Sequence, residues 1–310
     1  MMRTVLAAVM VAGVAMSASA ASNSNDAGAT SGSVLRLGSG AAQPAMGDAG
    51  VANTWGVAAM HYNPAGLGFT NRAEVQAMYQ NLVLDIGHGE IAVTHPINNV
   101  SSWGLGLTYL DYGKTQRVTL ADVINNQTPS TSFGGQDFVF KGAYGRQFNE
   151  YFGFGITGKV LNQQIDNVSA TSVMADLGLV IRPSNLPIRV GVTGANLGSK
   201  VKFNNTSEDL PLLVRGGAAV DLFDNRLTIT AEAEKVRDQD VTAQVGAEAR
   251  IMEMVALRIG WDGRVDADDG LTGGIGVKVN DLCIDYAFVP YGNLGNNHRI
   301  SLNYKFGPNY

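Results

Sequence analysis

The sequence predicts an all-β fold: a closed antiparallel transmembrane β-barrel of about fourteen strands with an N-terminal hatch or plug segment. Three observations predict it. The chain begins with an export signal, large apolar residues then alternate with small or polar ones, and short connections alternate with long ones. Bacterial single-chain barrels combine an even number of long strands with unequal loops at their two ends. The expected location is the outer membrane of a Gram-negative-type bacterium.

Residues 1–20 have the composition of a signal peptide. Arg3 supplies a positive start, residues 5–16 are apolar or small, and residues 18–20 give a small-x-small cleavage pattern. The apolar run is about a dozen residues, too short to cross a hydrocarbon core of roughly 30 Å as a helix. Residues 21–33 follow as a flexible polar linker, and no later segment is apolar enough to predict a transmembrane helix.

Composition excludes several classes of function. The single cysteine, Cys283, forms neither an internal disulfide nor a cysteine-rich metal site. A net charge of −5 without a long Lys/Arg cluster argues against a nucleic-acid partner. Glycine accounts for 38 of the 310 residues, which is above its usual share of about 7%, and the pattern of small residues along the strands explains this excess.

The barrel is predicted over residues 71–310 because this region alternates with period two. In residues 102–109, Trp, Leu, Leu and Tyr alternate with Ser, Gly, Gly and Thr, whereas a helix would place apolar residues three and four apart. Similar alternation marks residues 137–144, 227–234, 241–250, 255–261, 271–278, 282–288 and 300–306, and weaker strands are expected near 73–79, 88–95, 150–161, 173–181, 187–195 and 211–220.

Loop lengths also favour a barrel over a soluble sandwich. Brief inner turns are expected at 96–101, 149–150, 182–186, 222–225, 251–253 and 280–281. Longer outer loops are expected at 111–135, 198–210, 262–269 and 290–297, although the outer connections near Asp85 and at 237–240 are short. Short periplasmic turns and longer extracellular loops are typical of these barrels.

Charged residues on the small face favour a polar lumen. In a dry sandwich core they would carry a large desolvation cost unless paired, whereas in a lumen they are hydrated or matched across strands. These residues are Lys141, Glu232, Glu234, Glu248, Arg250, Arg258, Asp285 and Lys305. Aromatic residues near strand ends are expected to form interfacial girdles: Tyr79, Trp103, Tyr109, Tyr144, Phe152, Trp261, Tyr286 and Tyr304.

Residues 34–70 differ from the barrel because they are dense in glycine and alanine. These residues permit tight turns and close backbone approach, and Asn63-Pro64 forces a turn or an extended entry. The segment is therefore predicted to be a compact plug in the barrel mouth. Its most distinctive motif is Asn63, Pro64, Ala65, Gly66 and Leu67.

Residues 35–38, 48–52 and 62–67 resemble the start of PorV/PorQ-type proteins, which belong to the wider FadL-like group of outer-membrane barrels. Residues 298–307 are similar to the last strand of that family. The resemblance implies a fourteen-stranded barrel with a hatch threaded into the lumen by the segment that carries Asn63, Pro64 and Ala65. It also implies secretion-system components and exported proteins as partners, beside outer-membrane lipid and lipopolysaccharide.

Other motifs do not indicate a catalytic, cofactor or metal site. Residues 153–158 fit a dinucleotide glycine spacing, but they lie in a period-two strand with no helix after it. Asp262, Asp266, Asp268 and Asp269 share one outer loop without an EF-hand pattern, so a solvated loop, or one bridged by divalent ions to lipopolysaccharide, is favoured over a Ca²⁺ site. No Gly-x-Ser-x-Gly elbow occurs. The four histidines, His61, His88, His95 and His298, do not form a short metal-ligand motif.

Three functions follow from different classes. The first is a PorV/PorQ-like component that assists the export or surface delivery of proteins. The second is a FadL-like channel for small hydrophobic molecules, gated by the hatch. That reading requires an apolar groove in the lumen, whereas the inward faces are expected to be mostly small or charged. The third is an outer-membrane enzyme, which requires a convergent cluster of carboxylate, serine or histidine side chains.

Overall fold

The computed structural model describes residues 31–125, 128, 131–183, 186–203, 206–265 and 269–310. Fourteen strands form a closed antiparallel barrel, and β1 completes the circle by pairing with β16. The predicted fold class is confirmed. The predicted signal peptide and residues 21–30 of the linker lie outside the described residues. The barrel strands are β1 (Ala73–Asn81), β2 (Gly87–Asn98), β3 (Ser101–Arg117), β4 (Thr131–Gln147), β5 (Phe152–Ile165), β6 (Val168–Ile181), β7 (Ile188–Gly198), β10 (Leu213–Leu222), β11 (Leu227–Val236), β12 (Val241–Ile251), β13 (Val255–Asp262), β14 (Leu271–Val279), β15 (Leu282–Pro290) and β16 (Asn296–Phe306).

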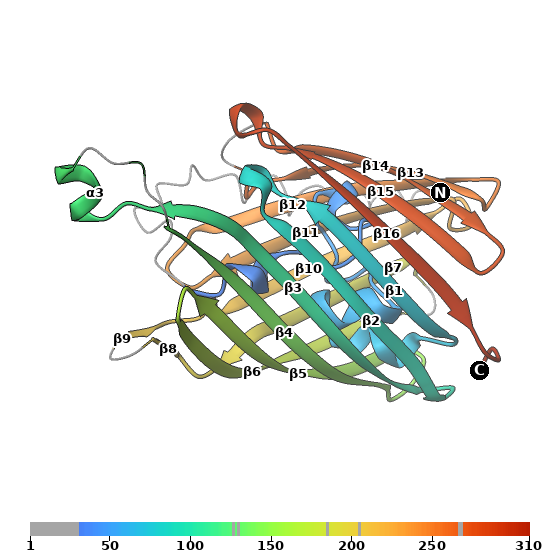
Figure 1. Ribbon diagram of the computed structural model, residues 1–310. Coiled ribbons are helices and arrows are strands. Elements are labelled where there is room, and N and C mark those ends of the chain that lie inside the picture. The colour runs from blue at the N-terminus through green and yellow to red at the C-terminus, as the bar shows by residue number, and fades with distance from the viewer. Residues whose placement is uncertain (1–30, 126–127, 129–130, 184–185, 204–205, 266–268) are drawn as a thin grey trace.

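The alternation of the sequence becomes the two faces of the barrel wall. Along β2 and β3 the large side chains of Ile91, Trp103 and Leu105 are exposed on the outside, while Glu90, Thr94 and Ser102 are buried inside. Period-two strands place successive side chains on opposite faces, and lipid covers the outer face of a membrane barrel. Figure 1 shows that the strands are tilted against the barrel axis.

At one end of the barrel the turns are short, and the first strand begins and the last strand ends there. β1 starts where β16 finishes, with Ala73 paired to Phe306. Turns at this end are tight and use left-handed residues such as Glu253 and Asn280. Because bacterial barrels have short periplasmic turns, we call this the inner, periplasmic end. The described residues of the predicted inner turns lie here, although β2 extends to Asn98 and so takes up part of the predicted turn 96–101.

The outer end carries the longer connections, with two departures from expectation. β3 extends to Arg117 and β4 begins at Thr131, so the predicted loop 111–135 is partly strand. β5 and β6 are joined by a tight turn at Asp166, which has a positive φ of 55°, where the sequence left a longer gap. The long β3–β4 hairpin projects beyond the rim and ends in the short helix α3 (Leu120–Ile124) (Figure 1).

The β7–β10 connection contains a separate two-stranded hairpin, β8 (Val201–Phe203) with β9 (Thr206–Glu208). Short 3-10 turns η4 (Val83–Asp85) and η5 (Gly292–Leu294) lie in the first and last outer loops. Among the described residues, every helix is too short or too polar to cross a membrane.

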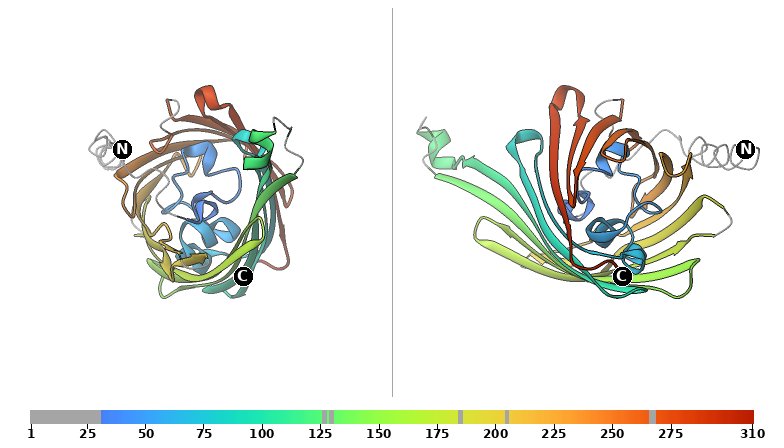
Figure 2. Two further views of the ribbon diagram at one scale, coloured as in Figure 1. Left: turned by 60° about the vertical axis from the view of Figure 1, so that its left-hand side comes forward. Right: turned by 90° about the vertical axis from the view of Figure 1, so that its right-hand side faces the viewer.

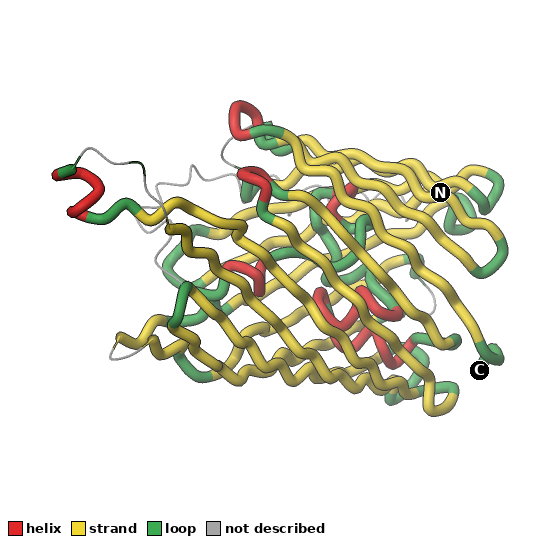
Figure 3. Tube along the Cα trace, in the orientation of Figure 1, coloured by secondary structure: helices red, strands yellow, loops and turns green. Residues whose placement is uncertain are grey.

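Residues 34–70, called the plug below, lie inside the barrel. The view along the axis in Figure 2 shows this segment surrounded by the wall, and its short helical turns are red in Figure 3. These turns are η1 (Ser33–Arg36), η2 (Pro44–Met46), α2 (Gly56–Tyr62) and η3 (Pro64–Phe69). Nearly all plug side chains are buried, so the core of this protein is the filled lumen.

Candidate functional site: the lumen and its plug

The plug is bound to the inner wall by hydrogen bonds around most of its circumference. The backbone N–H of Ala41 donates to Ser301 of β16 at 3.0 Å, and that of Gly47 donates to Thr272 of β14 at 3.0 Å. Glu232 of β11 accepts two bonds of 2.8 Å, from the backbone N–H groups of residues 50 and 51. Short irregular segments leave backbone groups without internal partners, and here the polar inward side chains of the wall supply those partners.

The predicted motif lies at the inner end of the plug, where Asn63 is completely buried. Its amide nitrogen donates to the carbonyl of Val51 at 2.8 Å and to the carbonyl of Leu179 in β6 at 2.9 Å. Its side-chain oxygen accepts from the N–H of Ala65 and so caps η3, with Pro64 at the first helical position. Asn63 therefore ties together two parts of the plug and the wall. Pro64, Ala65, Gly66 and Leu67 are also buried.

Inward glycines allow the plug to lie directly on the wall backbone. A Cβ added at Gly155 of β5 would overlap the backbone of Pro64, and one at Gly178 of β6 would overlap the Asn63 side chain. On the opposite wall, a Cβ at Gly260 of β13 would overlap Met46. Gly155 belongs to the 153–158 run, so close packing, rather than phosphate binding, accounts for this glycine. Part of the glycine excess therefore serves plug contact.

Buried charges on strands β10 to β15 are paired, and we call this side the ion-pair wall: Arg215, Glu232, Glu234, Glu248, Arg258 and Asp285. Arg215 donates to Glu234 at 2.8 Å and lies 3.6 Å from Glu232, with all three side chains almost inaccessible to solvent. Arg258 bridges Glu248 and Asp285 at 2.6 and 2.7 Å. The sequence allowed two explanations for these lumen charges, hydration or pairing with opposite charges across strands. The structure shows pairing. Of the remaining predicted lumen charges, Lys141 pairs with Glu90. Arg250 is exposed near the inner end and pairs with Glu248 at 2.7 Å, and Lys305 is also exposed there.

An ion pair connects the plug to the outer side of this wall. Arg264, in the β13–β14 loop, donates to Asp48 of the plug at 2.6 Å. The same guanidinium contacts Asp262 at 2.7 Å and lies 3.5 Å from Glu234. Asp48 also accepts a hydrogen bond from the Tyr62 hydroxyl. Asp262 therefore serves as an arginine partner, while Asp266 and Asp268 of the predicted acidic loop lie outside the described residues.

The inner faces of strands β3 to β6 carry an apolar patch, which we call the apolar wall: Leu110, Val139, Leu161, Ala170 and Met174. Val34 and Leu35 of η1 pack against it, together with Val201 of β8 and Leu210. The expectation of mostly small or charged inward faces did not include this patch, which shares strands β3 to β6 with buried charges such as Lys159 and Asp176. The patch could not be predicted from any one strand. Each of the four strands contributes one or two inward apolar residues, and their inward neighbours along the strand are polar or small. Val139, for example, lies two residues from Asp137 and from Lys141.

A cavity of about 510 Å³ opens at the inner end, beside the exit of η3. Phe69, Asn71 and Arg182 are among the residues that line it, with Arg189 and Asp221 on the neighbouring strands. We call this the inner vestibule.

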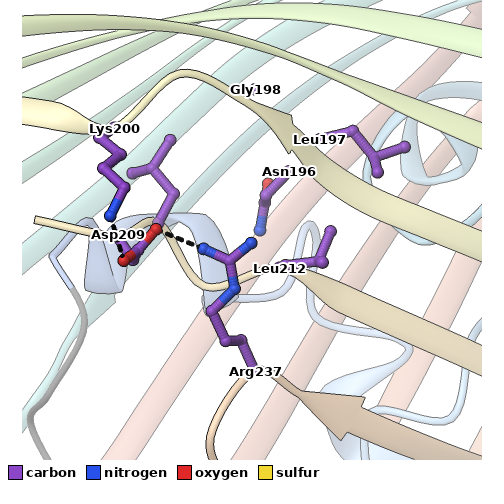
Figure 4. Close-up of a pocket in the computed structure, with 8 residues that line it drawn as sticks. Asn196, Leu197, Gly198, Lys200, Asp209, Leu212 and Arg237 are labelled. Carbon is purple, nitrogen blue, oxygen red and sulfur yellow. Dashed lines mark hydrogen bonds and ion pairs between the residues drawn. The ribbon is translucent and has the colours of Figure 1, made fainter.

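A smaller cavity of about 140 Å³ lies at the outer end, between the end of β7 and the start of β10. Figure 4 shows Lys200 and Arg237 directed at Asp209 from two sides, at 2.7 and 2.5 Å. The hydrogen bond from Lys200 is the main cause that lowers the pKa of Asp209 below its ordinary value, and Arg237 adds to the effect.

The histidines do not form a hydrolytic or metal-binding arrangement in the described part of the chain. His88 is hydrogen-bonded to Gln80 and His298 to Tyr286, while His95 stacks on Trp103. No group of three His, Cys, Asp or Glu side chains suited to a metal ion occurs among the described residues.

Comparison with known proteins places the fold. No family model matches the chain, and the curated proteins contain no match either. Two crystal structures of the Pseudomonas putida toluene transporter TodX are similar, both at 13% identity. One has a TM-score of 0.61 and covers 86% of this chain and 96% of that chain; the other has a TM-score of 0.63 and covers 87% and 99%. A Pseudomonas aeruginosa FadL homologue is similar with a TM-score of 0.59, also at 13% identity, over 86% and 98% of the two chains. The chain therefore has the FadL-like fold of outer-membrane barrels.

Proposed function

We propose that this protein is an outer-membrane channel for small hydrophobic molecules, with the plug as its gate. The apolar wall is the observation that carries the proposal, because it gives the outer part of the lumen an apolar lining where a polar pore would have none. η1 covers this lining. A molecule that displaced η1 would exchange one apolar contact for another at little cost in free energy.

The similarity of fold to a toluene transporter supports this proposal over a role in protein export. Apolar pockets with few polar groups are the usual binding sites for small uncharged ligands. At the plug's middle the side chains of Tyr62, Met60 and Leu67 are inaccessible to solvent. Passage would therefore require the plug to move, which makes it a gate and the 63–67 motif its inner anchor.

Uptake of labelled toluene by cells that rely on this channel tests the proposal. Leu161→Asn places an amide in the middle of the apolar wall and is expected to lower the uptake rate severalfold. Leu84→Asn makes the same chemical change at an exposed position of the first outer loop and is the matched control. Equal uptake by the wild type and the Leu161 variant, with both barrels folded, would count against the channel.

Assistance in protein export is the second candidate, and one surface feature favours it. Val118, Leu120, Val123 and Ile124 expose apolar side chains at the tip of the β3–β4 hairpin, well outside the barrel. Exposed apolar groups of this kind mark contact sites for other proteins. Replacing residues 118–124 with a Gly/Ser linker should then reduce surface delivery of exported proteins while leaving toluene uptake intact. Unchanged export after deletion of the gene would remove this candidate.

A further inference from the structure

We infer that the inner vestibule is a binding site for a small organic carboxylate, with Arg182 as its principal ligand. The inference goes beyond the proposed channel and does not rest on it. It starts from the cavity of about 510 Å³ at the periplasmic mouth, a volume within the range of sites for small molecules. The residues that line it include Asn71, Asn99 and Gln147, with amide side chains, and Pro183 and Leu186.

Arg182 carries a positive charge that the described residues leave unpaired. Its guanidinium lies over the rings of Phe69 and Trp55, with 5.1 and 5.5 Å to their centroids. No hydrogen bond or ion pair joins the guanidinium to a described residue, although it lines the cavity. The two rings hold the side chain in place, which reduces the entropy that a ligand-binding arginine would otherwise lose.

Arg189 adds a second cation to the same cavity and is only partly satisfied. It pairs with Asp221 at 2.8 Å and donates to Asn53 at 3.0 Å. Its Nε is buried without a hydrogen-bond acceptor among the described residues, and its guanidinium also lies 5.7 Å from the centre of the Trp55 ring. Two guanidiniums near one ring repel each other, so an anion bound beside them in the cavity relieves the repulsion.

The shape of the cation selects a carboxylate. A guanidinium presents planar, paired N–H donors that match the two oxygens of a carboxylate. Glu150 also lines the cavity, and no ion pair joins it to Arg182. The Glu150 carboxylate repels an anionic ligand and weakens its binding, so removing this charge by mutation should raise the affinity.

Binding at this site is expected to stabilise the plug. Trp55 and Phe69 belong to the plug, whereas Arg182 follows directly after β6, at the inner end of the wall. A ligand that fixes Arg182 on these rings holds the plug against the wall. By linkage, a seated plug favours ligand binding by the same factor.

Titration calorimetry of the purified full-length protein in detergent, with benzoate and with its neutral isostere benzamide, tests the inference. Benzoate should bind at least tenfold more tightly than benzamide. Arg182→Gln should weaken benzoate binding at least tenfold, and Glu150→Gln should strengthen it. Arg146→Gln is the matched control, because Arg146 is exposed near the same end of the barrel but does not line the cavity.

A second readout separates binding from folding. Benzoate should slow hydrogen exchange at residues 55–69 in the wild type and have no such effect in the Arg182 variant. If Arg182→Gln does not fold, Arg182→Lys keeps the charge but removes the planar fork, and it should bind benzoate severalfold more weakly. Equal binding of benzoate and benzamide, or an equal loss in the Arg146 variant, would overturn the inference. Benzoate binding at the inner vestibule and toluene uptake along the apolar wall are separate measurements at opposite ends of the lumen, so failure of the carboxylate site is distinct from failure of the channel.

Discussion

The two sides of the lumen hold the plug by different forces. On the apolar wall, η1 is held by contacts of Val34 and Leu35 with Leu161 and its neighbours, and such contacts have little directional preference. On the ion-pair wall, residues 48–51 are held by Glu232 and Arg264 through hydrogen bonds of fixed geometry. We therefore expect η1 to leave the wall more readily than residues 48–51, although η1 also reaches the ion-pair wall through Arg36, 3.8 Å from Glu234.

The largest effect is expected at the ion-pair wall. Arg215→Met leaves Glu232 and Glu234 buried without their main partner, and removing one member of a buried pair costs about 3–5 kcal/mol. Chemical unfolding of the barrel in lipid vesicles, followed by tryptophan fluorescence, measures this change. Adding Glu232→Gln and Glu234→Gln to the Arg215 variant should restore most of the stability. A single variant as stable as the wild type would mean that these charges are hydrated.

The next effect concerns the glycines on which the plug rests. Gly155→Val forces a side chain into the backbone of Pro64, and overpacking of this kind costs about 1–3 kcal/mol. We expect the inner end of the plug to leave the wall, with faster hydrogen exchange at residues 56–70 and higher conductance in planar bilayers. Gly158→Val on the same strand is the control, because a Cβ there meets only the Gly142 carbonyl oxygen, at 3.9 Å. Matching behaviour of the two variants would show that the close approach is unimportant.

Asn63→Asp tests the hydrogen bonds by which Asn63 joins two parts of the plug to each other and to β6. The change keeps the shape but replaces two N–H donors with a carboxylate that faces the carbonyls of Val51 and Leu179. Loss of hydrogen bonds in a buried site costs about 1–3 kcal/mol, and the effect should be confined to exchange in the plug. Asn280→Asp, in the exposed inner turn between β14 and β15, is the matched control. Unaltered exchange at residues 51 and 63–66 would contradict the anchor.

The smallest effect is expected at the outer rim. The folded-state pKa of Asp209 is lowered by Lys200, so the stabilisation it provides is complete above the unfolded value of about 4 and is lost as the pH falls through the lowered pKa. Acidification below pH ~4 should loosen the β7–β10 connection, seen as faster proteolysis there, while the barrel stays closed. Asp209→Asn should remove this pH dependence. An unchanged acid response in that variant would assign it to other groups.

Much of the fold could be read from the sequence because a membrane barrel repeats one simple rule. Trp103 and Leu105 on one face and Ser102 and Gly104 on the other are enough to define a strand and its two sides. The inner turns were predictable for the same reason, since they interrupt the alternation with polar residues. The β5–β6 turn at Asp166 was not predicted, because Gln164 and the residues after Val168 continue the strands with polar side chains near the outer rim.

The sequence by itself determined the barrel, its strand number and the presence of a compact segment at residues 34–70. These follow from local periodicity and from residue types that act within a few positions of one another. Only the tertiary structure decided how the lumen is filled, because Leu110, Leu161 and Met174 come from different strands and form one apolar surface only after the barrel closes. The inner vestibule depends on the fold in the same way, since the Arg182 guanidinium lies over the ring of Phe69, a residue far from it in the sequence.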